Sequence, residues 1–169
     1  MATTSSKVKK ITITAVLAAL ITIMTAYVCH IPVPSSGGYI HLGDSLIYLA
    51  ASILPSPYAA IAASIGGGLA DLLTAPMWTL PTIIIKALIT IPFCNKGAKI
   101  LSKRNMFAPL LAYCISATGY YLSNKLIFGN DVAFWVSISG SLIQSGGSAI
   151  LYLLFASTLD KMNFKQRIL

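Results

Sequence analysis

The sequence predicts an all-α integral membrane protein with six transmembrane helices and with both termini in the cytoplasm. Of its 169 residues, 56% are hydrophobic and only 9% are charged, whereas soluble domains carry about 25% charged residues. The apolar residues form runs of helical length, as expected of membrane-spanning segments. The basic residues lie between or beside these runs, as expected of cytoplasmic loops.

The six apolar runs predict the order of the spans in a single transmembrane domain, 1–169. The spans are expected at residues 11–29, 43–54, 58–73, 79–93, 106–128 and 132–158. Three basic clusters flank them: Lys7, Lys9 and Lys10; Lys96, Lys99, Lys103 and Arg104; and Lys161, Lys165 and Arg167. With six spans all three clusters fall on the cytoplasmic side, whereas five spans would put one terminal cluster outside. The apolar run of residues 11–29 is long for a signal peptide, so we expect a retained first span.

The net charge of +8 does not indicate a nucleic-acid partner, because the basic residues flank membrane spans. A modest attraction to anionic lipid headgroups is the expected consequence. The three cysteines, Cys29, Cys94 and Cys114, lie in or beside apolar runs without CxxC spacing. They predict neither a disulfide framework nor a metal site.

The stretch 37–86 holds polar groups that an apolar environment disfavours. His41, Asp44, Asp71 and Lys86 all lie in it. Charged groups inside a membrane need a partner or a wet cavity, so they suggest a functional site. We interpret Asp44 either as an acidic residue that stabilises the start of its helix or as a ligand contact. An Asp71–Lys86 pair is the second hypothesis, either as a buried link between spans or, as we favour, as part of a cavity wall.

The loop 30–42 contains proline, serine and glycine but no Lys or Arg, which predicts an outer loop that is not a regular helix and is suited to closing a binding site. The outer halves of the later spans carry polar and aromatic residues. We therefore expect a site that opens to the outside beneath this loop. Aromatic residues can also mark the membrane interface, which is the default interpretation of Trp78.

The motifs in the sequence leave several classes of function open. The sequence has no HExxH, no GxSxG and no clustered histidines, so an enzyme is disfavoured. Six short spans without inverted halves do not resemble a complete secondary transporter. A substrate-binding subunit that needs partners for energy fits best, while a membrane-embedded enzyme and an assembly factor are the alternatives. Ala15 and Ala19 form a small-xxx-small pattern, which suits either packing within the chain or docking of a partner.

Three segments carry a resemblance to a known family. They are GYIHLGDSLIYLAA from residue 38, IGGGLADLL from residue 65 and PMWTLPTIIIK from residue 76. Together they resemble the substrate-binding S components of energy-coupling factor (ECF) vitamin transporters, in particular the group of riboflavin, hydroxymethylpyrimidine and pyridoxine carriers. The sequence departs from the family pattern at three places. His41 replaces the usual Asn, Leu-Pro-Ser-Pro at 54–57 replaces the usual Leu-Gly-Pro, and Lys86-Ala87 replaces the usual Lys-Gly.

The resemblance implies an S-component-like bundle in the plasma membrane of a prokaryote. It implies capture of a water-soluble vitamin or precursor from outside, docking through Ala15 and Ala19 on a transmembrane coupling subunit, and ATP hydrolysis by two partner ATPase subunits, with no cofactor in this chain. Hydroxymethylpyrimidine or pyridoxine is the best guess, and riboflavin is the alternative. Aromatic faces for stacking and polar groups for orientation are then the expected ligand contacts. These residues are Tyr39, His41, Asp44, Trp78, Lys86, Tyr121, Asn124, Trp135 and Gln144.

Overall fold

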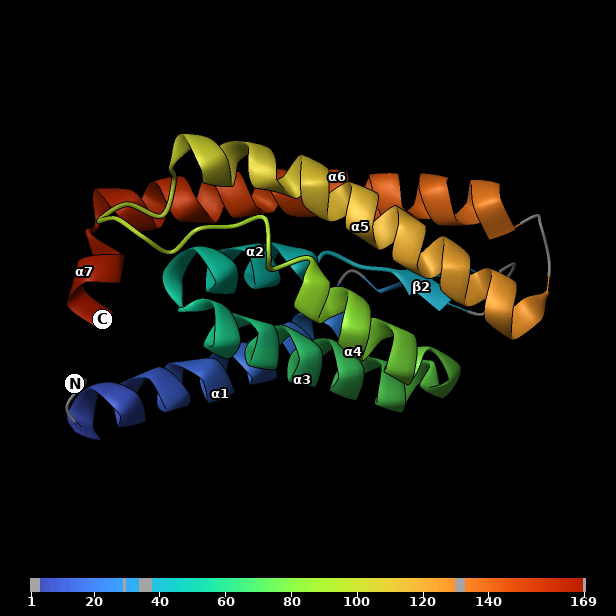
Figure 1. Cartoon of the computed structure of the whole chain (residues 1–169), viewed down its shortest axis with the longest axis horizontal. Coiled ribbons are helices and arrows are strands. Elements are labelled where there is room, and N and C mark those ends of the chain that lie inside the picture. Colours follow the sequence, from blue (N-terminus) through green and yellow to red (C-terminus); the bar gives the residue numbers. More distant parts are fainter. Residues whose placement is uncertain (1–3, 29, 34–37, 130–132, 169) are drawn as a thin grey trace.

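The computed structural model describes residues 4–28, 30–33, 38–129 and 133–168, and it is a nearly all-α bundle, as predicted (Figure 1). Its helices are α1 (Thr4–Ala26), α2 (Asp44–Ile53), α3 (Ser56–Thr74), α4 (Thr79–Leu88), α5 (Lys103–Phe128), α6 (Ala133–Lys161) and α7 (Phe164–Ile168). A hairpin of β1 (Ile31–Val33) and β2 (Gly38–Ile40) precedes α2, and the short 3-10 helix η1 (Pro76–Trp78) precedes α4.

The helices form two groups with α2 between them. On one side α1 packs against α3, and α3 packs against α4; on the other side α5 packs against α6 (Figure 1). Helix α2 contacts both α3 and α6, and its buried face joins the two groups. The N- and C-terminal ends lie at the same end of the bundle (Figure 1).

Glycines in α3 allow its backbone to approach neighbouring helices closely. A Cβ atom on Gly66 would lie 2.7 Å from the side chain of Ile21 and 2.8 Å from the backbone oxygen of Ala18. A Cβ atom on Gly67 would lie 2.8 Å from Cγ of Lys86. Close backbone contact of this kind is typical of helix packing in membranes, where small residues lie at the interfaces. The absence of a side chain at Gly67 therefore sets the path that the Lys86 side chain takes.

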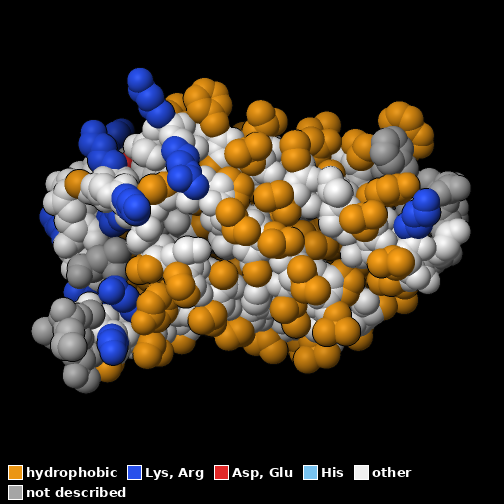
Figure 2. All heavy atoms as spheres, viewed as in Figure 1, with side chains coloured by type: hydrophobic (Ala, Val, Ile, Leu, Met, Phe, Trp, Pro, Cys, Tyr) orange, Lys and Arg blue, Asp and Glu red, His pale blue; other side chains and the backbone are white. Residues whose placement is uncertain are grey.

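The surface has the distribution expected of a protein surrounded by lipid. Figure 2 shows apolar side chains over the body of one face, with most Lys and Arg at the end that holds the termini. Exposed apolar residues include Leu80 (74% exposed) and Phe107 (73%). Among the described residues, two segments have the length and hydropathy needed to cross a membrane, Ser6–Ala26 and Ser137–Lys161.

Two short helices differ from simple spanning segments. Helices α2 and α4 have 10 residues each, about 15 Å at 1.5 Å per residue, against a hydrocarbon core of about 30 Å. The fourth apolar run was expected to be helical to residue 93, but α4 ends at Leu88 and hydrogen-bonded turns follow. Pro92 explains part of this difference, because proline disfavours helical geometry in the residue before it.

The segment after α4 is held by side chains from α5 and α6. Asp160 accepts hydrogen bonds from the backbone N–H groups of Ile100 and Leu101 at 2.7 and 2.9 Å. Asn105 donates to the carbonyls of Cys94 and Ile100, both at 2.8 Å. These bonds satisfy the polar groups of an irregular backbone without helical partners.

The loop 30–42 contains regular structure that its composition did not predict. Strands β1 and β2 pair antiparallel, with Ile31 opposite Ile40 and Pro32 opposite Tyr39. The sequence predicted a loop without a regular helix, and it did not predict these two strands. Residues 34–37 lie outside the described part of the chain, as do Cys29 and the first residue of the expected sixth span.

Candidate functional site

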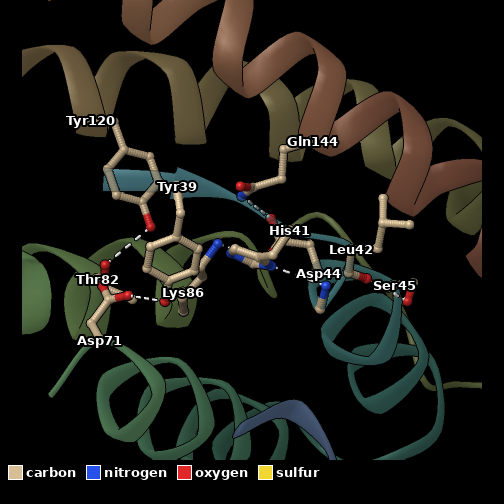
Figure 3. A network of polar contacts seen from close by, with 11 residues as sticks. Tyr39, His41, Leu42, Asp44, Ser45, Asp71, Thr82, Lys86, Tyr120 and Gln144 are labelled. Carbon is tan, nitrogen blue, oxygen red and sulfur yellow. Dashed lines mark hydrogen bonds and ion pairs between the residues drawn. The ribbon is translucent and has the colours of Figure 1, made fainter. Parts of the chain in front are cut away.

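The centre of the candidate site is an ion pair buried between helices. The Lys86 Nζ atom lies 2.6 Å from Oδ1 of Asp44, and the two side chains are 1% and 0% exposed. Gln144 on α6 donates from Nε2 to the second oxygen, Oδ2, of Asp44 at 2.9 Å (Figure 3). Residues from α2, α4 and α6 thus meet at one carboxylate. Burying two charges costs several kcal/mol unless they are paired and hydrogen-bonded, and the contacts of Asp44 with Lys86 and Gln144 meet both conditions.

The backbone supports both charges of this pair. Asp44 lies in the first turn of α2 and Lys86 lies in the last turn of α4. A helix carries partial positive charge at its N-terminus and partial negative charge at its C-terminus, so each group lies at the end that stabilises it. The N-cap residue of α2 is Gly43, which has no side chain to cap the helix. The contacts of the Asp44 carboxylate with Lys86 and Gln144 show that it does more than stabilise the start of its own helix.

The expected Asp71–Lys86 pair is wrong, because Lys86 forms its salt bridge with Asp44. The Lys86 stem packs on the bare backbone at Gly67 of α3. Asp71 lies on α3 one helical turn after Gly67, and it accepts a short hydrogen bond from the Tyr39 hydroxyl (Figure 3). The two carboxylates in this part of the chain therefore have different partners.

Tyr39 connects the hairpin to the helical core. Its ring stacks on His30 with centroids 3.9 Å apart, and its hydroxyl donates to Asp71 on α3. Burial and the neighbouring Asp71 carboxylate raise the pKa of Tyr39, so this hydroxyl keeps its proton. The bond places a phenol ring from β2 against the polar cluster (Figure 3).

His41 is a neutral hydrogen-bonding group beside the ion pair. Its side chain is 4% exposed, and Nδ1 accepts the N–H of Gly43 at 3.0 Å. A neutral imidazole that accepts at Nδ1 carries its proton on Nε2. Burial, and then the positive charge of Lys86, lower the pKa of His41 to about 3. His41 therefore contributes an N–H donor and no charge at neutral pH.

An aromatic wall, formed by Trp78 and Tyr120, completes the site. The two rings meet edge to face with centroids 5.9 Å apart. The Tyr120 hydroxyl lies 3.1 Å from Oγ1 of Thr82, and Lys86 Nζ lies 5.5 Å from the Tyr120 ring centroid. Tyr120 and Thr82 were absent from the predicted set. The signal that identifies Thr82 is its place one helical turn before Lys86.

The structure brings five of the predicted contacts into one cluster. They are Tyr39, His41, Asp44, Lys86 and Gln144. Trp78 borders the cluster through Tyr120. Asn124 instead donates to Ser137 at 2.9 Å, which links α5 to α6.

Two predicted aromatic contacts have a different environment. Trp135 is 72% exposed, and Tyr121 is half-buried next to Tyr120. Within the described ranges no three His, Cys, Asp or Glu side chains lie close enough to hold a metal, and Cys94 and Cys114 are free thiols. A contact of Tyr121, Asn124 or Trp135 with a ligand remains a prediction.

A helical bundle with an apolar surface and a buried polar cluster beside its hairpin is the architecture of a membrane protein with an internal polar site. The sequence profile of the family described as "ECF-type riboflavin transporter, S component" matches residues 5–161. The chain therefore belongs to this family of ECF transporter S components. It is also 28% identical over 139 residues to a protein of Pyrococcus woesei described as an uncharacterized protein in the gap 3′ region, covering 76% of this chain and 92% of the relative.

Family membership establishes the general class of activity. The protein is a substrate-binding component of a transporter in the plasma membrane, and the family consists of transport components rather than enzymes. Such components work with the membrane and ATPase subunits of the ECF transporter.

Proposed function

We propose that the protein captures a small, water-soluble aromatic heterocycle from outside the cell, namely hydroxymethylpyrimidine or pyridoxine. The observation that carries the proposal is the buried cluster of Asp44, Lys86 and Gln144 beneath the hairpin. A bound heterocycle can exchange hydrogen bonds with these groups and with the N–H of His41, while Tyr39 and the aromatic wall offer ring faces. A few well-placed polar groups beside aromatic surfaces are typical of small-molecule sites.

Riboflavin is the second candidate. The matching family is described by riboflavin transport, which favours this ligand. His41 stands where related carriers with the resembling motif have Asn, and it lies inside the polar cluster. This change alters the hydrogen-bond pattern relative to the carriers of all three compounds, so it supports a ligand contact at His41 without separating the two candidates.

The proposed topology has six membrane crossings with both termini in the cytoplasm. Both termini and most Lys and Arg of the visible face lie at the same end of the bundle, which supports this orientation (Figures 1 and 2). The hairpin and Asp71 then face the outside. The short helices α2 and α4 take part in this topology within the bundle rather than as isolated spanning helices.

Docking on the coupling subunit is proposed to use Ala15 and Ala19 on α1. Both side chains are exposed, whereas Ala18 between them is 5% exposed and faces α3. Exposed small residues let another helix approach closely within a membrane. Two ATPase subunits would supply the energy, and the nucleotide would bind to them rather than to this chain.

The test is to identify what the protein binds. The protein is purified in detergent, co-purified small molecules are extracted for mass spectrometry, and binding of hydroxymethylpyrimidine, pyridoxine and riboflavin is measured by calorimetry. We expect saturable binding of one compound at a 1:1 ratio and its loss in Lys86→Met. Absence of binding to all three, with no co-purified heterocycle, would contradict the proposal. Conversion of a bound compound without partner subunits would favour the enzyme alternative.

A further inference from the structure

Asp71 lies in an unfavourable electrostatic position. It is in the last turn of α3, which ends at Thr74, and its side chain is 5% exposed. The C-terminal end of a helix carries partial negative charge, so a carboxylate there is repelled by the backbone. Asp44 and Lys86 each lie at the helix end that stabilises their charge. Asp71 differs from both and needs another source of compensation.

The described side chains do not supply a full counter-charge. The salt bridge found within the described ranges joins Lys86 to Asp44, and Asp71 accepts from neutral hydroxyl groups, those of Tyr39 and Thr82. His41 is neutral at physiological pH. When both carboxylates are ionised, the single ammonium group of Lys86 leaves the cluster with one uncompensated negative charge. In a site of low dielectric constant, an unbalanced charge of this kind favours binding of the opposite charge.

The surroundings of Asp71 suit a cationic ring compound. Its Oδ1 atom accepts a hydrogen bond from the hydroxyl of Tyr39, whose ring forms one face of the cluster (Figure 3). Thr82 lies beside Asp71 and is joined by a 3.1 Å hydrogen bond to Tyr120, whose ring lies near that of Tyr39 in the same view (Figure 3). Aromatic faces attract cations as well as rings. A carboxylate that is hydrogen-bonded to one phenol group and lies near a second therefore combines charge recognition with aromatic surface.

We propose that Asp71 is a specificity-determining residue that pairs with a positive charge on the ligand, so that the site prefers a nitrogen heterocycle bearing an ammonium or protonated ring nitrogen. This inference rests on the proposed function and narrows its substrate class. The Tyr39 hydroxyl and the ligand cation then share the carboxylate, which couples ligand charge to the position of the hairpin. A neutral heterocycle would leave the negative charge of the cluster uncompensated.

The experiment compares ligands that differ only in charge. The first pair is pyridoxamine and pyridoxine, and the second is aminomethylpyrimidine and hydroxymethylpyrimidine; each pair exchanges an ammonium for a hydroxyl group on the same ring. Calorimetry on the purified full-length protein is expected to show that at least one aminomethyl compound binds about tenfold or more tightly than its hydroxymethyl partner, the ratio typical of a hydrogen bond to a charged group.

Asp71→Asn tests the residue directly. The amide oxygen can still accept the Tyr39 hydroxyl, but the negative charge is lost, so the preference for the aminomethyl compound is expected to disappear. Asp160→Asn is the matched control, because it removes the same charge where α6 holds residues 100–101. It is expected to leave the ratio of affinities unchanged even if it lowers stability. Tyr39→Phe, which keeps the carboxylate, is expected to retain the preference.

The outcomes separate this inference from the proposed function. If the wild-type protein binds the hydroxymethyl compounds or riboflavin as tightly as the aminomethyl compounds, Asp71 does not select charge, although the binding function stands. A preference that persists in Asp71→Asn also overturns the inference. If that variant does not fold, the affinities of the wild-type protein for the paired ligands decide whether the site selects a positive charge. Failure of the wild-type protein to bind any of the five compounds contradicts the proposed function itself.

Discussion

Lys86 on α4 and Asp44 on α2 form a salt bridge of 2.6 Å in which both side chains are withdrawn from solvent. The residues are 42 positions apart in the sequence, and their contact fixes the relative positions of two short helices. A buried charge without its partner is strongly destabilising, so the stability of the fold depends on keeping both residues of the pair.

Lys86→Met is expected to destabilise the protein by about 3–5 kcal/mol, because it leaves the Asp44 carboxylate buried without a cation. The double variant Asp44→Leu with Lys86→Met is expected to regain most of this stability, since no unpaired charge remains. Ligand binding is expected to be lost in both. Thermal unfolding in detergent, followed by calorimetry, measures the two effects. Equal stability of the single and double variants would contradict the proposed cost of an unpaired Asp44.

Gly67→Ala is expected to displace the Lys86 side chain. The new Cβ atom would lie 2.8 Å from Cγ of Lys86 and 3.1 Å from Cγ2 of Thr82. Overpacking of this kind typically costs about 1–3 kcal/mol, and we expect a parallel loss of ligand affinity because Lys86 moves relative to Asp44. Gly140→Ala is the matched control, since its Cβ atom would meet nothing within 4 Å. If both variants behave alike, close packing at Gly67 does not position the lysine.

Much of the bundle could be predicted from the sequence because apolar runs and flanking basic clusters depend on composition alone. The identity of the lysine's partner could not, because Asp44 and Asp71 are both plausible until the crossing of α3 and α4 at Gly67 is known. Tyr121 was predicted from the sequence, whereas Tyr120 lies at the polar cluster. Consecutive residues on a helix differ by about 100° in direction, so the rotation of α5 must be known to choose between them. The hairpin was not predicted because the proline, glycine and serine residues of this segment are typical of loops, and strands of three residues are too short to show an alternating pattern.

His41 is expected to make stability depend on pH. Its pKa in the folded protein is about 3, whereas an unfolded histidine has a pKa of about 6.5. Below pH 6.5 the unfolded chain therefore binds a proton that the folded protein excludes, and stability falls as the pH decreases toward 3. The loss attributable to His41 is about 2 kcal/mol at pH 5, from 1.36 kcal/mol per pH unit.

The measurement for His41 is thermal unfolding across pH 7.5 to 5 in detergent. His41→Asn has no titrating ring, so its stability is expected to vary less with pH than that of the wild-type protein. His30→Asn is the matched control, because His30 is half-buried and stacks on Tyr39 outside the ion pair. Identical pH profiles for the wild-type protein and His41→Asn would show that the buried ring does not control this dependence.

Ala15→Trp and Ala19→Trp are expected to block assembly without harming the ligand site. Both positions are exposed on α1, so a large side chain is tolerated within the chain, but it prevents close approach of a partner helix. Co-purification with the coupling subunit and ligand uptake in cells are expected to be lost, while calorimetry on the isolated protein shows unchanged binding. Val16→Trp, at a residue that is 54% exposed on the adjacent face of the helix, is the matched control and is expected to assemble normally. Assembly that survives both alanine substitutions would assign Ala15 and Ala19 to lipid contact, and docking would then have to use another face of the bundle.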